Sequence, residues 1–306
     1  MNFQTQVPIQ KPNFQIDYKS HIFSIGSCFA ESMAQKFDYF KFNILSNPFG
    51  ILFHPLAIEK VLHKAISEIP FTENDIFFHN ELYHCFDVHS EFSHSDKDIL
   101  LQNLNQKLKE TKSFLEKSNY IIITLGTSWV YILKEKNEVV ANCHKVPQKE
   151  FLKELLSVEQ IAKSLENIIS LFPDRKIIFT VSPIRHIKDG FAENTLSKSL
   201  LFVGLSEVLK KYQNTYYFPS YEIVMDELRD YRFYKEDMLH PTSVAVDYIW
   251  QRFSENYFSQ EAIQISKEVD AIRKALNHKP FNPETEQHKK FVEKTQQQIK
   301  KLGFQI

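Results

Sequence analysis

The stretch HIFSIGSCFA, residues 21–30, joins an apolar run of strand length to the beginning of a helical pattern. The run His21–Ile25 is short and apolar, which is typical of a buried strand. The helical pattern covers Phe29–Phe40, so Gly26-Ser27-Cys28 falls on the turn between them. A side chain at such a turn lies at a helix N-terminus, where backbone N–H groups favour negative charge. The stretch therefore predicts a strand–turn–helix unit that presents a nucleophile.

The same rhythm of short apolar runs and helical patterns continues along the chain. Further buried strands are predicted at roughly Phe40–Leu45, Tyr120–Leu125, Lys176–Ser182 and Thr215–Phe218. Helices are predicted at Pro55–Ile66, Ile99–Leu115, Ser157–Leu171 and Leu196–Tyr212. Near-continuous apolar strands suit a parallel sheet that is covered on both faces. Strands that alternate with helices predict a three-layer α/β/α domain.

Two segments depart from this rhythm. Within a domain of residues 1–258, residues 71–95 mix aromatic residues and histidines, which we interpret as an irregular or β-hairpin insertion. Residues 259–306 form a C-terminal helical extension with helices at Gln260–His278 and Glu284–Leu302. The second helix carries only a thin apolar stripe. The pair is therefore expected to be clamped on the domain surface, with an oligomer contact as the alternative.

The composition argues against several classes of function. The 306 residues carry 37 basic and 38 acidic side chains, so the net charge of -1 gives no reason to expect nucleic acid or a membrane as partner. No apolar run approaches the roughly 20 residues of a spanning helix, and the first residues do not resemble a secretory signal. Three cysteines are a sparse, odd set, so a soluble, cytoplasmic protein is expected. The chain has only 6 Gly and no glycine-rich phosphate loop, and no cofactor is expected.

Residues that suit catalysis follow each predicted strand. In open α/β sheets, ligands bind outside the carboxyl ends of the strands. The segments in these places are Gly26-Ser27-Cys28, Asn47-Pro48-Phe49-Gly50, Gly126-Thr127-Ser128-Trp129, Ser182-Pro183-Ile184-Arg185-His186 and, after the fifth strand, Asp237-Met238-Leu239-His240. An Asp-x-x-His motif can deliver a base together with the carboxylate that orients it. The set is typical of a hydrolase that attacks acyl groups.

The sequence resembles the SGNH or GDSL hydrolase superfamily over most of residues 20–250. It resembles more closely the GSCFA family, whose motif is intact as Gly26-Ser27-Cys28-Phe29-Ala30. The resemblance implies a flavodoxin-like sheet of about five parallel strands in the order 2-1-3-4-5. It also implies a nucleophile at Cys28, a base at His240 and an orienting acid at Asp237, and hence a hydrolase or acyltransferase.

The oxyanion hole that the resemblance implies is altered in this chain. Gly50 follows the second strand, as in the superfamily, but Gly126-Thr127-Ser128 puts Ser128 where the superfamily has an asparagine. A hydroxyl is shorter than an amide, so the backbone N–H groups of Cys28 and Gly50 are expected to bind more of the oxyanion. Removing one side-chain donor from such a site lowers the rate by about a hundredfold or more.

Two neighbouring residues could act as the nucleophile. A thiol is intrinsically more nucleophilic, and a helix N-terminus and a nearby histidine lower its pKa. Ser27 has a structural role available as the N-cap of the following helix. We therefore favour Cys28, with Ser27 as the alternative and a buried apolar filler as the structural explanation of Cys28. The structural alternative for Asp237 and His240 is a turn that caps the next helix.

Arg185 could bind a carboxylate or phosphate, and His89 could reach a substrate. His79, His84, His89 and His94 recur every five residues, a spacing that fits neither helix nor strand, so no metal site is expected. The sequence thus predicts attack on an ester or thioester through a covalent acyl-enzyme, with a small-molecule or glycan acyl ester as substrate. The alternative is a non-catalytic module that binds a small molecule or glycan on the same fold.

Overall fold

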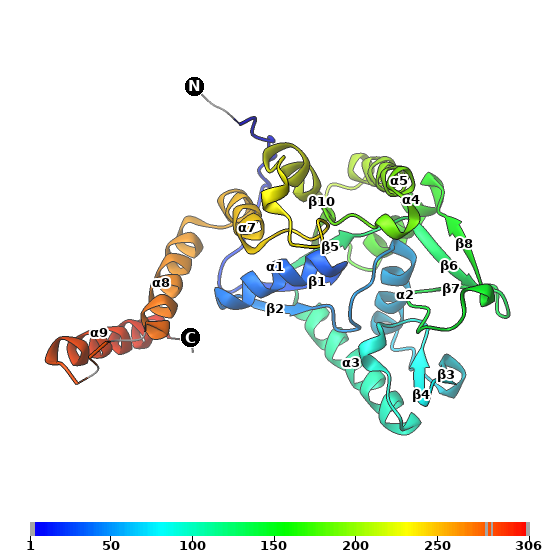
Figure 1. Ribbon diagram of the computed structural model, residues 1–306, viewed down its shortest axis with the longest axis horizontal. Coiled ribbons are helices and arrows are strands. Elements are labelled where there is room, and N and C mark those ends of the chain that lie inside the picture. Colours follow the sequence, from blue (N-terminus) through cyan, green and yellow to red (C-terminus); the bar gives the residue numbers. More distant parts are fainter. Residues whose placement is uncertain (1–3, 279–280, 283, 304–306) are drawn as a thin grey trace.

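The centre of the molecule is a five-stranded parallel sheet (Figure 1). The structure is a computed structural model that describes residues 4–278, 281–282 and 284–303. The strands of the sheet are β1 (His21–Gly26), β2 (Asn43–Ser46), β5 (Tyr120–Leu125), β9 (Lys176–Val181) and β10 (Thr215–Tyr217). Their spatial order is β10-β9-β5-β1-β2. Counted along the chain this order is 2-1-3-4-5, which confirms the predicted sheet.

Two hydrophobic cores cover the two faces of the sheet. In β9, Ile177 and Phe179 enter one core and Ile178 enters the other. In β5, Ile121 and Ile122 divide in the same way. Successive side chains of a strand point to opposite faces, so a strand that is apolar at every position needs cover on both. The apolar runs therefore predicted the layers correctly.

Helices form the two outer layers (Figure 1). One face carries α1 (Cys28–Tyr39) and α7 (Ser243–Tyr257), and the other carries α2 (Pro55–Ile66), α3 (Lys97–Lys117), α4 (Val158–Ser170) and α5 (Phe191–Lys211). A short α6 (Ser220–Glu222) follows β10. The predicted helices are present with shifted ends: α1 begins at Cys28 because Ser27 is its N-cap. Strand β2 begins later than predicted because residues 40–42 make a turn, with Lys41 at a φ of 64°.

Two antiparallel insertions lie at one end of the sheet (Figure 1). The first is the hairpin of β3 (Ile76–His79) and β4 (Leu82–Cys85), within the stretch 71–95. The second is a three-stranded sheet in the order β7-β6-β8, which the sequence analysis missed, formed by β6 (Trp129–Leu133), β7 (Glu138–Val140) and β8 (Phe151–Leu155). These three strands are short and only partly buried. Their apolar signal is therefore weaker than that of the central strands.

Helices α8 (Gln260–Asn277) and α9 (Glu286–Leu302) extend from the domain on the side away from the insertions (Figure 1). Three side chains of α8 are buried, namely Ala262, Val269 and Ile272, and α9 packs against α8. Phe291 and Val292 of α9 stay exposed, so an oligomer contact through this helix remains a prediction. None of the described helices combines the length and the apolarity that a bilayer crossing requires.

Candidate active site

The turn after β1 is fixed by close backbone packing. Gly26 has a φ of 142°, and a Cβ at this position would lie 2.2 Å from the carbonyl oxygen of Thr124 in β5. The N–H of Gly26 donates to Asn47 Oδ1 at 2.8 Å, and the N–H of Ser27 donates to Thr124 O at 3.0 Å. Only glycine fits this position. The glycine of the motif therefore sets the direction in which the chain leaves the strand and enters α1.

Ser27 and Cys28 occupy different environments at the start of α1. Ser27 is fully buried, and its Oγ accepts a hydrogen bond from the N–H of Phe29 as the helix N-cap. Cys28 is the first residue of the helix, is half-buried and lines a pocket. The turn thus directs the thiol, and not the hydroxyl, to the space that a substrate could enter.

The segment after β10 brings Asp237 and His240 to the same edge of the sheet. The N–H of Lys235 donates to His240 O at 2.7 Å and closes the turn. Asp237 Oδ1 accepts hydrogen bonds from the N–H groups of Leu239 and His240, both at 2.9 Å. Met238 has a φ of 58°, a conformation that non-glycine residues adopt only when their surroundings hold them there. The Asp237 carboxylate is therefore held by the backbone of its own turn through Oδ1, which leaves Oδ2 for the imidazole.

Cys28, His240 and Asp237 form one line of contacts. Cys28 Sγ lies 3.8 Å from His240 Nε2, and His240 Nδ1 lies 2.6 Å from Asp237 Oδ2. An ionised carboxylate can only accept, so Nδ1 carries the proton and Nε2 faces the thiol with its lone pair. The histidine thus has the tautomer and the position from which it can accept a proton from the thiol.

The environment sets the protonation of the two outer groups. Burial raises the pKa of the Cys28 thiol; the N–H groups at the start of α1 and the Lys198 ammonium oppose this rise, while the Glu31 carboxylate adds to it. The thiol is therefore protonated near neutral pH. At the other end of the line, hydrogen bonds from the N–H groups of His240 and Leu239 lower the pKa of Asp237 to about 2. Its carboxylate stays ionised throughout the physiological range.

The thiol faces a pocket of about 520 Å³. The missed sheet β7-β6-β8 contributes Trp129 and Tyr131 to its walls, and the segment after β9 contributes Arg185 and Lys188. Asp189 lines the same pocket but is paired with a lysine of β8. An insertion and a loop, neither of which belongs to the central sheet, therefore determine what can approach the thiol.

Three residues expected to help bind an oxyanion make other contacts. The N–H of Gly50 donates to the carbonyl of Asn47 at 2.8 Å, and the N–H of Gly126 donates to the carbonyl of Phe53 at 2.7 Å. Ser128 is fully buried, and its Oγ donates to a backbone carbonyl of α5 at 3.0 Å. None of the three lines the pocket. In this arrangement they hold neighbouring loops together.

The histidine-rich stretch also lies apart from the thiol. The ring of His89 caps a short turn, lies 3.7 Å from Glu91 Oε2 and does not line the pocket. His84 is held by Ser93 Oγ at 2.6 Å and by the carbonyl of His79 at 2.9 Å. Within the described ranges, no three His, Cys, Asp or Glu side chains are grouped as ligands for a metal ion.

A buried lysine, Lys198 of α5, was missed by the sequence analysis. Its Nζ donates to Gly126 O at 2.6 Å and to Ser182 O at 2.7 Å, at the ends of β5 and β9. Burial lowers its pKa to about 7, and the charge of Cys28 acts against this shift. The sequence did indicate that Lys198 is buried, since it lies on the apolar stripe of α5 that continues with Leu201 and Leu205.

Two protein-family profiles match the chain. The profile of the GSCFA family matches residues 21–253, and that of the C-terminal domain of GSCFA domain proteins matches residues 269–306. No curated protein matches the chain.

Among solved structures, two are similar at 11% sequence identity and a TM-score of 0.39. One is described as a platelet activating factor from Streptococcus pneumonia, and the match covers 78% of this chain and 84% of that one. The other is the acetyl xylan esterase Est2A from the rumen bacterium Butyrivibrio proteoclasticus, with 87% of this chain and 66% of that one covered.

Proposed function

The chain belongs to the GSCFA family, and from that premise we propose that it is an acyl hydrolase or acyltransferase with Cys28 as its nucleophile. The observation that carries the proposal is the line of contacts from the Cys28 thiol through His240 to Asp237. The substrate is an ester or thioester of a small molecule or glycan that enters the pocket at the thiol. All three cysteines are free, which suits work in a reducing compartment such as the cytoplasm.

The reaction proceeds through a thioester on Cys28. The sulfur attacks the acyl carbon while its proton passes to His240 Nε2, and the carbonyl electron pair moves onto oxygen. Collapse of the tetrahedral intermediate expels the alkoxide or thiolate, which takes the proton from His240. Water or a second alcohol then gives a proton to His240 and attacks the acyl carbon, and collapse of the second tetrahedral intermediate expels the Cys28 sulfur, which takes the proton back from His240. Asp237 holds the imidazole and stabilises the imidazolium in both halves.

General-base catalysis fits this site better than a preformed thiolate–imidazolium pair. Burial keeps the pKa of Cys28 above its ordinary value, so the proton is on sulfur when the substrate arrives. We propose the N–H of Cys28 as an oxyanion donor, because the first N–H groups of a helix have no intrahelical acceptor. Gly50 and Ser128 would join it only if their present hydrogen bonds opened.

A His240 ring far from both Cys28 and Ser27 would favour the alternative of a non-catalytic binding module. The 3.8 Å separation between sulfur and Nε2 favours catalysis over binding alone. Ser27 is the weaker nucleophile candidate, because it is fully buried and its Oγ is engaged as the N-cap.

Mass spectrometry of the intact protein after exposure to an activated ester and an activated thioester tests the proposal. We expect one acyl adduct on Cys28, absent in Cys28→Ala and strongly slowed in His240→Ala. Cys143→Ala is the matched control, since Cys143 is a second thiol in the same pocket, and it should label like the wild type. Ser27→Ala should keep the adduct. An adduct on Ser27 or Cys143, or none with any ester or thioester, contradicts the proposal.

A further inference from the structure

Arg185 stands between two pockets. It lines the pocket of Cys28 and His240, and it also lines a second pocket of about 400 Å³ with Tyr221 and Tyr231. If the acyl carbon of a ligand lies at the thiol, the rest of the ligand could therefore extend past Arg185. The residue follows β9, at the same carboxyl edge of the sheet as the proposed nucleophile.

The guanidinium of Arg185 is held in place without being neutralised. It lies over the ring of Tyr234, 5.4 Å from the centroid, and one terminal nitrogen lies 3.9 Å from Met225 Sδ. A thioether is a weak acceptor, whereas a guanidinium has five N–H donors arranged as a fork. Among the residues that the structure describes, no carboxylate forms an ion pair with Arg185. The fork is therefore oriented, charged and short of acceptors.

The remaining charges of the catalytic pocket do not compensate this cation. Asp189 is engaged by Lys153, whose ammonium lies 4.5 Å from the centre of the Trp129 ring. Lys188 lines the pocket and has no ion-pair partner in the described part of the chain. His186 adds no charge near neutral pH, because burial lowers its pKa to about 4. The free charge of the pocket is thus positive.

We infer that Arg185 binds a carboxylate or phosphate group of the acyl substrate, so that the substrate class is an anionic ester or thioester and not a neutral one. The inference deepens the proposed function and rests on it for the position of the reacting carbonyl. Carboxylates and phosphates both accept two parallel hydrogen bonds from a guanidinium, which gives orientation as well as binding. The group lies beyond the scissile bond, at the guanidinium of Arg185, and not deeper in the second pocket, whose lining includes Asp226 and Asp230.

Two alkylating reagents of nearly equal size test the charge preference without any acyl transfer. Iodoacetate and iodoacetamide both modify a thiol, and only the first carries a carboxylate. We take the rate constant for iodoacetate divided by that for iodoacetamide at Cys28, and normalise it by the same ratio for the neutral thiol N-acetylcysteine amide. This normalised ratio should be about ten. Arg185→Gln should return the ratio to near one. Arg175→Gln is the matched control, because Arg175 precedes β9, at the opposite edge of the sheet, and lines neither pocket, so it should leave the ratio unchanged.

A competition measurement identifies the anion. Inorganic phosphate and succinate should each slow alkylation of Cys28 by iodoacetamide, and the stronger competitor shows which of the two groups the site prefers. Both effects should disappear in Arg185→Gln and weaken in Arg185→Lys, which keeps the charge but loses the fork.

The outcomes separate the inference from the proposed function. A charge preference that depends on Arg185, without acyl transfer to any ester, leaves the anion site standing and removes the proposed reaction. Acyl transfer at Cys28 with equal ratios and equal competition in wild type and Arg185→Gln overturns the anion site and leaves the reaction. Failure of both readouts overturns both.

Discussion

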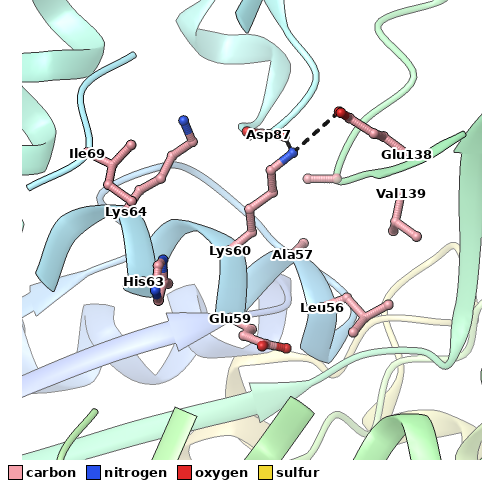
Figure 2. A pocket seen from close by; sticks show the side chains of 11 residues that line it. Leu56, Ala57, Glu59, Lys60, His63, Lys64, Ile69, Asp87, Glu138 and Val139 are labelled. Carbon is pink, nitrogen blue, oxygen red and sulfur yellow. Dashed lines mark ion pairs between the residues drawn. The ribbon is translucent and has the colours of Figure 1, made fainter. Parts of the chain in front are cut away.

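Two pockets of similar size differ in how their charges are compensated. The larger, of about 620 Å³, is lined by residues of α2 and by Asp87 and Glu138. Lys60 reaches from α2 toward both carboxylates (Figure 2), with Nζ 2.7 Å from the buried Asp87 and 3.9 Å from Glu138. Lys64 is paired in turn with Asp75 at 3.1 Å. These five charges therefore have partners within the protein.

The pocket of Cys28 is smaller, and two of its charged side chains form no ion pair within the described residues. It holds a thiol beside a histidine, and the cations Arg185 and Lys188 lack carboxylate partners in the described residues. Charges that pair with each other contribute to stability, whereas a charge without a partner is available to a ligand. Pocket volume alone would thus not have selected the site that we propose, and the state of the polar groups distinguishes the two.

The sharpest test of the comparison substitutes residues in both pockets. Cys28→Ala should abolish acyl transfer, and His240→Ala should lower kcat/KM by about a thousandfold or more, because it removes the base that lies 3.8 Å from the sulfur. Lys60→Met should leave kcat/KM within about twofold. Steady-state kinetics on one activated thioester checks all three. If Lys60→Met lost as much activity as His240→Ala, the two pockets would have to act together in catalysis, which contradicts the comparison.

Asp237→Asn should have the next largest effect, lowering kcat/KM by about a hundredfold. The amide can present its N–H to His240 Nδ1 and reverse the tautomer, although a thiol depends less on a strong base than a hydroxyl does. With wild-type protein, activity should not fall on acidification through protonation of Asp237 until about pH 2, its lowered pKa. An Asp237→Asn enzyme with wild-type kcat/KM would show that the carboxylate does not orient the base.

Lys60→Met should reduce stability rather than activity. It leaves the carboxylate of Asp87 buried without its cation, which should lower the free energy of unfolding by about 2 kcal/mol. Chemical denaturation measures the change. The double variant Lys60→Met/Asp87→Asn should be more stable than the sum of the single changes predicts, because both charges are removed together. Strict additivity would mean that the ion pair contributes nothing.

Lys198 provides the most specific test, since it is a buried titratable group that interacts electrostatically with Cys28. Its pKa is lowered to about 7 in the folded protein, from an ordinary value of 10.5. Between these values the unfolded chain binds more protons, so stability should rise with pH, by at most about 1.4 kcal/mol per pH unit. Below pH 7 both states are protonated, and this slope vanishes.

Lys198→Met isolates that contribution. Relative to the variant, the free energy of unfolding of the wild type should increase between pH 7 and 9, as measured by denaturation at each pH. The variant should also be less stable overall, because Gly126 O and Ser182 O lose their donor. Parallel pH curves for the two proteins would show that Lys198 keeps its ordinary pKa.

The central sheet could be predicted from the sequence, and the walls of the pocket could not. Strands such as Tyr120–Leu125 are buried on both faces, and this burial is visible as an unbroken apolar run. The strand Trp129–Leu133 packs in a small peripheral sheet and alternates between exposed and buried positions over few residues. Because Trp129 and Tyr131 belong to this strand, the sequence did not reveal these two walls of the Cys28 pocket.

The sequence by itself determined the strand–turn–helix unit at Gly26-Ser27-Cys28 and the close pairing of Asp237 with His240. Both depend on contacts between residues a few positions apart, which local spacing fixes. Only the tertiary structure decided that Cys28 rather than Ser27 faces the pocket, and that the N–H of Gly50 is already bonded. The physical reason is that a polar atom takes whichever partner the packing of distant segments supplies, and no local pattern records that choice.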